Sequence, residues 1–175
     1  MSLEELNQKL KEQNLIGYWT IPNTSTAFRE PEANFRPFLW KWREIRAALD
    51  DAAKCIRPEE AFRRFIGYQH PELKLGTAHT LLMGAQMVRP GEFAPAHRHT
   101  YTVVYHAFRG SGTTRIGEQE FKWEQGDSFV APLWNWHSHE NNSKEPAILF
   151  SINDRPAIEA LGFFREETLK TSSNV

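Results

Sequence analysis

Histidines in two short segments constrain the fold of this chain more than any other feature. His97 and His99 flank Arg98, and His137 follows thirty-eight residues after His99. Residues i and i+2 of a β-strand project from one face, and the residue between them projects from the other. His97 and His99 can therefore reach one ion together, while Arg98 points to the outer face, where its guanidinium stays solvated. With His137 on a neighbouring strand, the pattern predicts a β-structure that carries a three-histidine metal site.

The spacing of the residues around these histidines supports this interpretation. A histidine pair two residues apart is by itself more often an ordinary polar strand face than a set of ligands. Here Gly91 lies six residues before the pair, Gly126 lies six residues before Pro132, and Asn141 lies four residues after the third histidine. From residue 79 onward, alternating apolar and polar residues are separated by glycine and asparagine turns, which is typical of short antiparallel strands. Asn141 is expected to be one of these turn residues.

Three runs of sequence carry a resemblance to a known family. Residues 90–100 read PGEFAPAHRHT, residues 134–139 read WNWHSH and residues 151–156 read SINDRP. They resemble the motifs of the cupin superfamily and, within it, those of the gentisate 1,2-dioxygenase group, and the similarity covers residues 79–153. The resemblance implies a mainly β fold: a single cupin barrel (double-stranded β-helix, or jelly-roll) with N-terminal helices and a short C-terminal helix.

The metal implied by the resemblance is Fe(II), held by His97, His99 and His137. Many cupins carry a glutamate a few residues after the second histidine, but residues 100–106 contain no acid. Gentisate-type dioxygenases also lack it, and a neutral ligand set leaves the charge of the ion available for an anionic substrate. Ligand chemistry alone leaves zinc, nickel, manganese and copper open. The implied reaction cleaves the ring of a hydroxylated aromatic acid, such as gentisate, with dioxygen.

Substrate residues are carried over from the resemblance where positions match. Gly84 and Gln86 match pocket residues of the family. His139 matches another and is assigned as a catalytic acid or base, or as a residue that orients a ligand. Arg63 or Arg64 aligns with an arginine pair from which the family contributes a contact to the substrate carboxylate.

Two further residues are predicted to lie in the pocket: Tyr105, which differs from typical dioxygenases, and Trp136, which precedes the third ligand. Tyr105 stands where those enzymes have an arginine, so a bidentate contact to a carboxylate is replaced by one neutral hydrogen bond. Trp136, like Trp134, either packs at the barrel rim or forms a wall of the substrate pocket. The known dioxygenases resemble tandem double cupins, whereas 175 residues with one pair of motifs hold one barrel.

Two alternative functions remain open at this stage. One is a cupin that holds a metal and binds a small ligand without turnover, which the single barrel and Tyr105 favour. The other is a non-oxygenase metalloenzyme, such as an isomerase or a decarboxylase acting on a related acid. Oxygen dependence separates them from a dioxygenase, because a binding protein forms no product and an isomerase or decarboxylase forms product without oxygen.

Residues 1–70 are expected to form a helical arm and connector, and residues 71–175 the cupin barrel with a C-terminal extension. Leucines at positions 3, 6 and 10 predict an amphipathic first helix, which packs on the barrel wall or takes part in a dimer. Residues 40–54 are predicted to be helical. A second short helix is predicted to begin at Pro58 and to end at Arg63 and Arg64. The length and the 40% apolar content fit one structural domain.

Charge and cysteine content exclude several other kinds of partner. The net charge of −1 provides no basic stripe for nucleic acid and no polybasic patch for a membrane. Cys55 is the only cysteine, so no intramolecular disulfide can form. With no apolar leader segment, a cytoplasmic location is expected. Cys55 is expected to pack as a small side chain at a helix end and to have no catalytic role. The expected partners are a small aromatic acid, dioxygen and a second copy of the chain, in a homodimer or higher homo-oligomer.

Overall fold

The computed structural model describes residues 2–12, 35–56 and 64–169. The chain divides into two units, Met1–Pro37 and Phe38–Val175. The first unit contains helix α1 (Leu3–Glu12), as its leucine spacing predicts. The backbone N–H of Glu5 donates to Ser2 Oγ, and the Ser2 N–H donates to a Glu5 carboxylate oxygen. These reciprocal bonds form a capping box, which explains why the helix begins here.

Helix α2 (Trp42–Cys55) belongs to the second unit and packs on strands β1 and β2. Its buried residues Ile45, Leu49 and Ala53 follow helical spacing and join an apolar cluster with Met87 of the sheet. The sequence-based expectation for Cys55 was wrong in one respect, because this residue ends the helix with its side chain exposed instead of packed. The helix predicted from Pro58 and the side chain of Arg63 lie outside the described residues.

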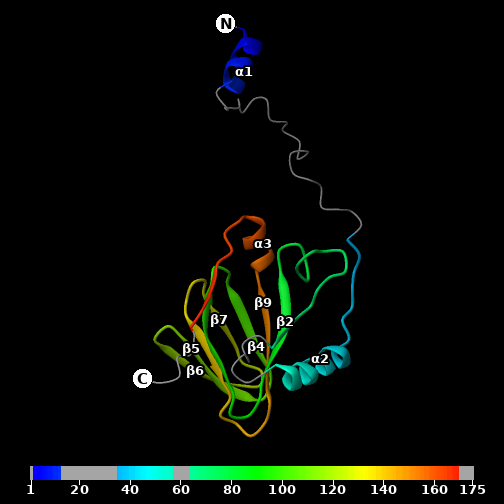
Figure 1. The fold of residues 1–175 in the computed structure, drawn as a ribbon, viewed down its shortest axis with the longest axis vertical. Coiled ribbons are helices and arrows are strands. Elements are labelled where there is room, and N and C mark those ends of the chain that lie inside the picture. The colour runs from blue at the N-terminus through cyan, green and yellow to red at the C-terminus, as the bar shows by residue number, and fades with distance from the viewer. Residues whose placement is uncertain (1, 13–34, 57–63, 170–175) are drawn as a thin grey trace. The chain divides into compact units, whose positions relative to one another are not determined.

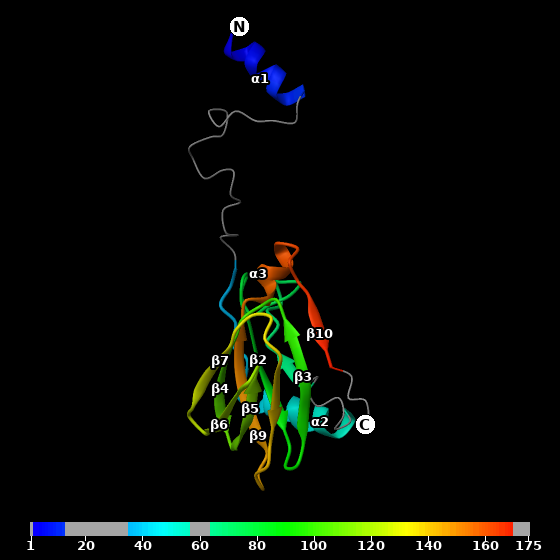
Figure 2. The same cartoon turned by 90° about the vertical axis from the view of Figure 1, so that its left-hand side faces the viewer.

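Two five-stranded antiparallel sheets form the barrel (Figures 1 and 2). The first sheet has the order β1 (Phe65–Gly67), β2 (Leu82–Val88), β9 (Ala147–Asn153), β4 (Val103–Arg109) and β7 (Ser128–Ala131). The second has the order β10 (Glu166–Thr168), β3 (Phe93–His99), β8 (His137–Glu140), β5 (Ser111–Ile116) and β6 (Gln119–Glu124). A short helix, α3 (Arg155–Ala160), follows β9 at one end of the barrel (Figure 1). The mainly β architecture with few helices agrees with the prediction.

The core lies between the sheets and comes from alternate residues of the strands. In β4, Val103, Tyr105 and Ala107 are buried while the residues between them are exposed. They join Trp123 and Leu149 in one apolar cluster. This alternation is the pattern expected when one face of each strand points to the core. None of the helices in the described part of the chain is long and apolar enough to cross a membrane.

Candidate metal centre

The three predicted ligands come together at one end of strands β3 and β8. His97 and His137 are directly paired across these strands, and His99 is the last residue of β3. One nitrogen from each ring can be chosen so that all three atoms lie within 4.8 Å of one another. The ring centroids of His97 and His137 are 4.3 Å apart, and those of His99 and His137 are 4.8 Å apart. The structure thus contains the predicted three-histidine cluster.

A bulge in β3 gives the histidine pair its direction. Ala94 pairs with His139, yet His97 and not Ala96 pairs with His137, so β3 has one extra residue between the two pairs. Because side chains alternate between the faces of a strand, a regular β3 would place Ala96 toward the barrel interior and turn both histidines away from it. The extra residue reverses this alternation. Pro95 lies within the bulge, a position that suits a residue without a backbone N–H.

Main-chain carbonyls fix the protonation of each ring. The Nδ1 atoms of His97, His99 and His137 lie 3.1, 2.8 and 2.9 Å from the carbonyl oxygens of residues 95, 101 and 135. A carbonyl oxygen can only accept, so each Nδ1 carries the proton and each Nε2 carries a lone pair. Partners of this kind are typical of histidines that bind metals.

Burial keeps the three imidazoles neutral. It lowers the pKa of His137 to about 3 and that of His99 to about 4, and it also lowers the pKa of His97. Withdrawal from water disfavours the charged form of each ring, and the neighbouring histidines add to the effect at His99 and His137. Three neutral imidazoles with converging lone pairs fit a divalent metal such as iron or zinc.

Two tyrosines adjoin the cluster. The Tyr101 ring stacks on His99 with the centroids 3.6 Å apart, and the Tyr105 hydroxyl lies 3.5 Å from His137 Nε2. Burial is the largest cause that raises the pKa of both hydroxyls, so each stays a neutral phenol at physiological pH. Tyr105 therefore offers an uncharged hydroxyl beside a ligand, as its substitution for an arginine predicts.

A pocket of about 390 Å³ opens beside His97 and His99. This is large enough for a single-ring acid, because ligand pockets typically span 300–1,000 Å³. Its walls combine apolar, polar and charged side chains from both sheets and from α3: Phe65, Leu82, Gln86, Tyr101, Val103, Tyr105, Ser151, Asn153, Arg155 and Glu166. The predicted substrate residues Gln86 and Tyr105 are thus brought together next to the metal ligands.

Gly84 acts on the pocket through its neighbour Phe65. A Cβ atom on Gly84 would overlap the Phe65 ring and lie 2.7 Å from the backbone oxygen of Ile66. The missing side chain therefore lets the Phe65 ring lie across β2 and line the pocket. The sequence identified the position, but the role of the glycine follows from this close packing.

Replacing Gly84 with alanine is expected to displace the Phe65 ring and to destabilise the fold by about 1–3 kcal/mol, as overpacking usually does. Chemical denaturation would measure the loss. The double variant Gly84→Ala with Phe65→Leu is the matched control and should recover part of it, because the smaller side chain removes the overlap. Equal stability of Gly84→Ala and the native chain would contradict this account.

His139 is fully buried, and it is not one of the described residues that line the pocket. Thr114 Oγ1 accepts the indole N–H of Trp123 and lies 2.8 Å from His139 Nδ1. The structure gives no hydrogen-bond partner for His139 Nε2. Burial lowers the pKa of His139 well below its usual value. The ring is a neutral group packed edge-to-face against Tyr105, 4.8 Å away between centroids; its catalytic assignment stays a prediction.

Trp136 lies with Arg98, and the residues found to line the pocket do not include either. The Arg98 guanidinium lies 4.4 Å from the Trp134 ring and 4.6 Å from the Trp136 ring, and it forms an ion pair with Glu167. Arg98 is therefore on the outer face, as predicted. There it remains partly exposed and contacts two aromatic rings and a carboxylate, which are the partners that a guanidinium prefers.

Arg64 is buried and paired away from the pocket lining. Its two Nη atoms form a bidentate pair with the Glu92 carboxylate, which also accepts hydrogen bonds from the backbone and side chain of Arg89. These bonds outweigh the opposing effect of burial and lower the pKa of Glu92 to about 2. The pair joins the start of β1 to the start of β3. Arg64 directly precedes β1 in the described residues, and its predicted contact with a substrate carboxylate stays a prediction.

Several pocket residues escaped the sequence analysis. Tyr101 could have been found, because it lies two residues after His99. Asn153 and Arg155 belong to the SINDRP run, which contributed to the resemblance without a role for either residue. No motif in the sequence indicated Phe65 or Glu166. These residues lie far along the chain from the histidine segments and reach the pocket only through strand pairing.

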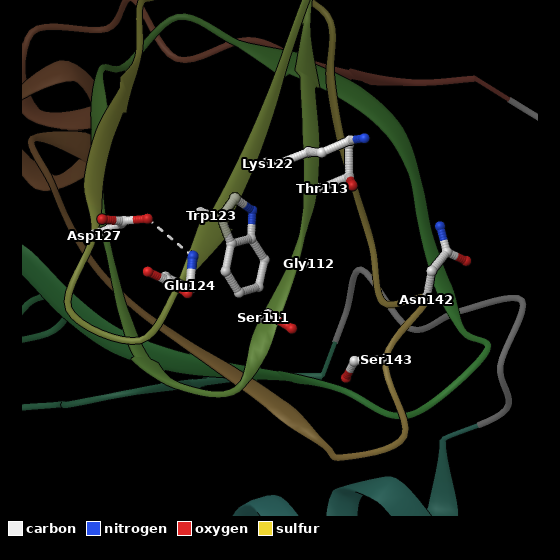
Figure 3. A pocket seen from close by; sticks show the side chains of 9 residues that line it. All are labelled: Ser111, Gly112, Thr113, Lys122, Trp123, Glu124, Asp127, Asn142 and Ser143. Carbon is white, nitrogen blue, oxygen red and sulfur yellow. Dashed lines mark hydrogen bonds between the residues drawn. The ribbon is translucent and has the colours of Figure 1, made fainter.

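A second, larger hollow of about 560 Å³ lies on β5 and β6 and contains none of the three histidines (Figure 3). Its lining includes the Trp123 side chain together with polar residues such as Lys122 and Asn142. Size alone would favour this hollow as a ligand site. The smaller pocket is the better candidate, because only it adjoins the converging nitrogen atoms.

Comparison with known proteins identifies the class of this protein first. Residues 84–153 match the cupin domain family. Two solved structures of a salicylate 1,2-dioxygenase from Pseudaminobacter salicylatoxidans, one of them an adduct with gentisate, have TM-scores of 0.74 and 0.75. They are 22% and 21% identical to this chain, covering 99% of it and 50% and 49% of the solved chains. The two-sheet barrel of this protein therefore has the cupin fold.

Within the superfamily, the sequence is gentisate 1,2-dioxygenase-like. It is 40% identical to a 5-aminosalicylate 1,2-dioxygenase from Comamonas over 91% of this chain. It is 32% identical to a gentisate 1,2-dioxygenase from Aquipseudomonas alcaligenes over 89% of this chain. The matches cover 44% and 45% of those two proteins, so the chain spans about half the length of these relatives.

Proposed function

We propose that the protein is a non-haem Fe(II) dioxygenase that cleaves the ring of a hydroxylated aromatic acid. The observation that carries this proposal is the convergence of three neutral imidazoles beside a pocket sized for one aromatic ring. The similarity to relatives that are named 1,2-dioxygenases of aminosalicylate and gentisate supports the same reaction class. Self-association of the chain and a cytoplasmic location stay predictions.

His97, His99 and His137 would hold the metal, which would bring substrate and dioxygen together and supply the redox chemistry. The protein contributes position and environment. Phe65, Leu82 and Val103 provide apolar walls for a ring, and Gln86 provides an amide that can bond its polar substituents. The neutral Tyr105 hydroxyl can donate a hydrogen bond without adding charge next to the cluster.

The test is oxygen uptake by protein loaded anaerobically with Fe(II) and then given gentisate, salicylate or 1-hydroxy-2-naphthoate. Uptake is expected with at least one acid, together with a ring-opened product. It should be absent without substrate and in the His97→Ala variant. No uptake with any acid, with metal shown to be bound, would overturn the proposal.

Two measurements on the same samples distinguish the alternatives. Saturable binding of an acid with no product would indicate a cupin that binds its ligand without turnover. Product formed under anaerobic conditions would indicate an isomerase or a decarboxylase. The Tyr105→Arg variant restores the residue found in typical dioxygenases and would show whether Tyr105 limits turnover.

A further inference from the structure

The pocket contains a cation that the sequence analysis did not assign. Tyr105 offers only a neutral hydroxyl. Arg155 at the start of α3 lines the same pocket. Among the lining residues, all of which lie in the described part of the chain, Arg155 is the one permanently charged cation.

Contacts on two sides fix the Arg155 guanidinium. Its Nε donates to a Glu159 carboxylate oxygen at 2.7 Å, one helical turn further along α3. Its Cζ lies 4.4 Å from the centroid of the Phe164 ring. A guanidinium held by a carboxylate and an aromatic face loses less freedom when it binds an oxyanion, because its orientation is already set.

Tyr101 connects this guanidinium to the metal ligands. Tyr101 and Arg155 both line the pocket, and the Tyr101 ring stacks on the His99 ring with the centroids 3.6 Å apart. The Phe164 ring lies beside both side chains, with its centroid 6.2 Å from that of Tyr101 and 4.4 Å from Arg155 Cζ. Arg155, Tyr101 and the ligand His99 therefore line the same pocket.

The donors and charges of this wall suit a carboxylate. A guanidinium has five N–H donors in a planar fork that matches the two oxygens of a carboxylate, and the bond to Glu159 uses the Nε donor. Glu166 also lines the pocket and brings a negative charge. The charge of Arg155 therefore favours an anionic group of a ligand in this pocket.

We propose that Arg155 binds the carboxylate of the substrate and makes the pocket select an aromatic acid over its neutral analogue. The proposal rests on the proposed function, since it assigns one residue to the substrate of that site.

The test measures binding without turnover, using Zn(II)-loaded protein and two probes. One probe is gentisate, and the other is 2,5-dihydroxybenzamide, in which a neutral amide replaces the carboxylate. The native protein should bind the acid more tightly than the amide. In Arg155→Met, the Kd for gentisate should rise about 10- to 100-fold, as loss of a charge-assisted bond predicts, while the Kd for the amide should stay nearly constant.

Two further variants separate binding from structure. Arg155→Lys keeps the charge and should retain part of the preference for the acid. Arg115→Met removes the arginine of an exposed ion pair between Arg115 on β5 and Glu120 on β6. This variant should leave the affinities for gentisate and for the amide unchanged. Thermal unfolding of each variant monitors the packing of α3.

The outcomes distinguish this inference from the proposed function. If native Zn(II) protein binds none of gentisate, salicylate and 1-hydroxy-2-naphthoate, the proposed function fails and the inference fails with it. A different outcome is that the native protein binds gentisate while Arg155→Met raises the Kd for both probes by the same factor, or raises neither Kd. In either case Arg155 is not the carboxylate ligand, and the proposed function stands.

Discussion

Replacing His137 with alanine is expected to remove bound metal and activity together. The substitution leaves two of the three clustered imidazole rings, and two imidazoles cannot complete the ligand set of a three-histidine site. Loss of an outer partner alone typically costs 10- to 100-fold in metal affinity, so loss of a direct ligand should cost more than about 100-fold. Elemental analysis of the purified, reconstituted protein measures the metal content.

The matched control for this prediction is His106→Ala. His106 is also a strand histidine, but its side chain bonds Ser128 Oγ on the exposed face of β4, away from the cluster. This variant should retain native metal content. Full metal retention in each of the three single-ligand variants would show that the ion is held elsewhere.

Replacing Glu92 with glutamine is expected to destabilise the protein by about 3–5 kcal/mol, because it leaves a buried guanidinium without its counter-charge. Arg64 is fully buried, and the bidentate contact with Glu92 supplies its charge partner. Urea denaturation followed by circular dichroism measures the change. Glu120→Gln breaks the exposed pair with Arg115 and should cost no more than about 1 kcal/mol. Equal effects of the two substitutions would contradict the importance of burial.

The same carboxylate makes stability depend on pH. The pKa of Glu92 is lowered from 4.5 to about 2 in the folded protein. A lowered pKa means that the unfolded chain binds the proton more readily than the folded chain does. The contribution of Glu92 is therefore complete above pH 4.5 and is lost progressively as the pH falls toward 2. Glu92→Gln should flatten the acid side of the stability curve, and an unchanged curve would show that other carboxyl groups determine it.

The metal ligands could be predicted from the sequence, but the reason they face the interior could not. Strand alternation correctly places His97 and His99 on one face and Arg98 on the other. Nothing in the alternation says which face points inward, because that depends on the extra residue between Ala94 and His97. The resemblance supplied the correct answer, and the paired register of β3 and β8 supplies its physical cause.

The pocket was only partly predictable, because its walls come from segments far apart along the chain. Gln86 and Tyr105 were found through their positions in the resemblance, and both line the pocket. Arg155 approaches it only because α3 follows β9 at one end of the barrel. Arg64 was predicted from its alignment to contact the substrate, but it is not among the residues that line the pocket. Its side chain forms a buried ion pair with Glu92, which the alignment did not indicate.

The carbonyl partners of the three ligand rings have a consequence for how this centre can change during evolution. Each Nδ1 proton is held by the main chain at positions 95, 101 and 135, so exchanging the side chain at any of these positions leaves an acceptor in place. Point substitutions can therefore accumulate around the ligands without altering their tautomers. An insertion or deletion in β3 would be different, because it would move the bulge and turn two rings at once. The centre should tolerate drift in composition and resist changes in length.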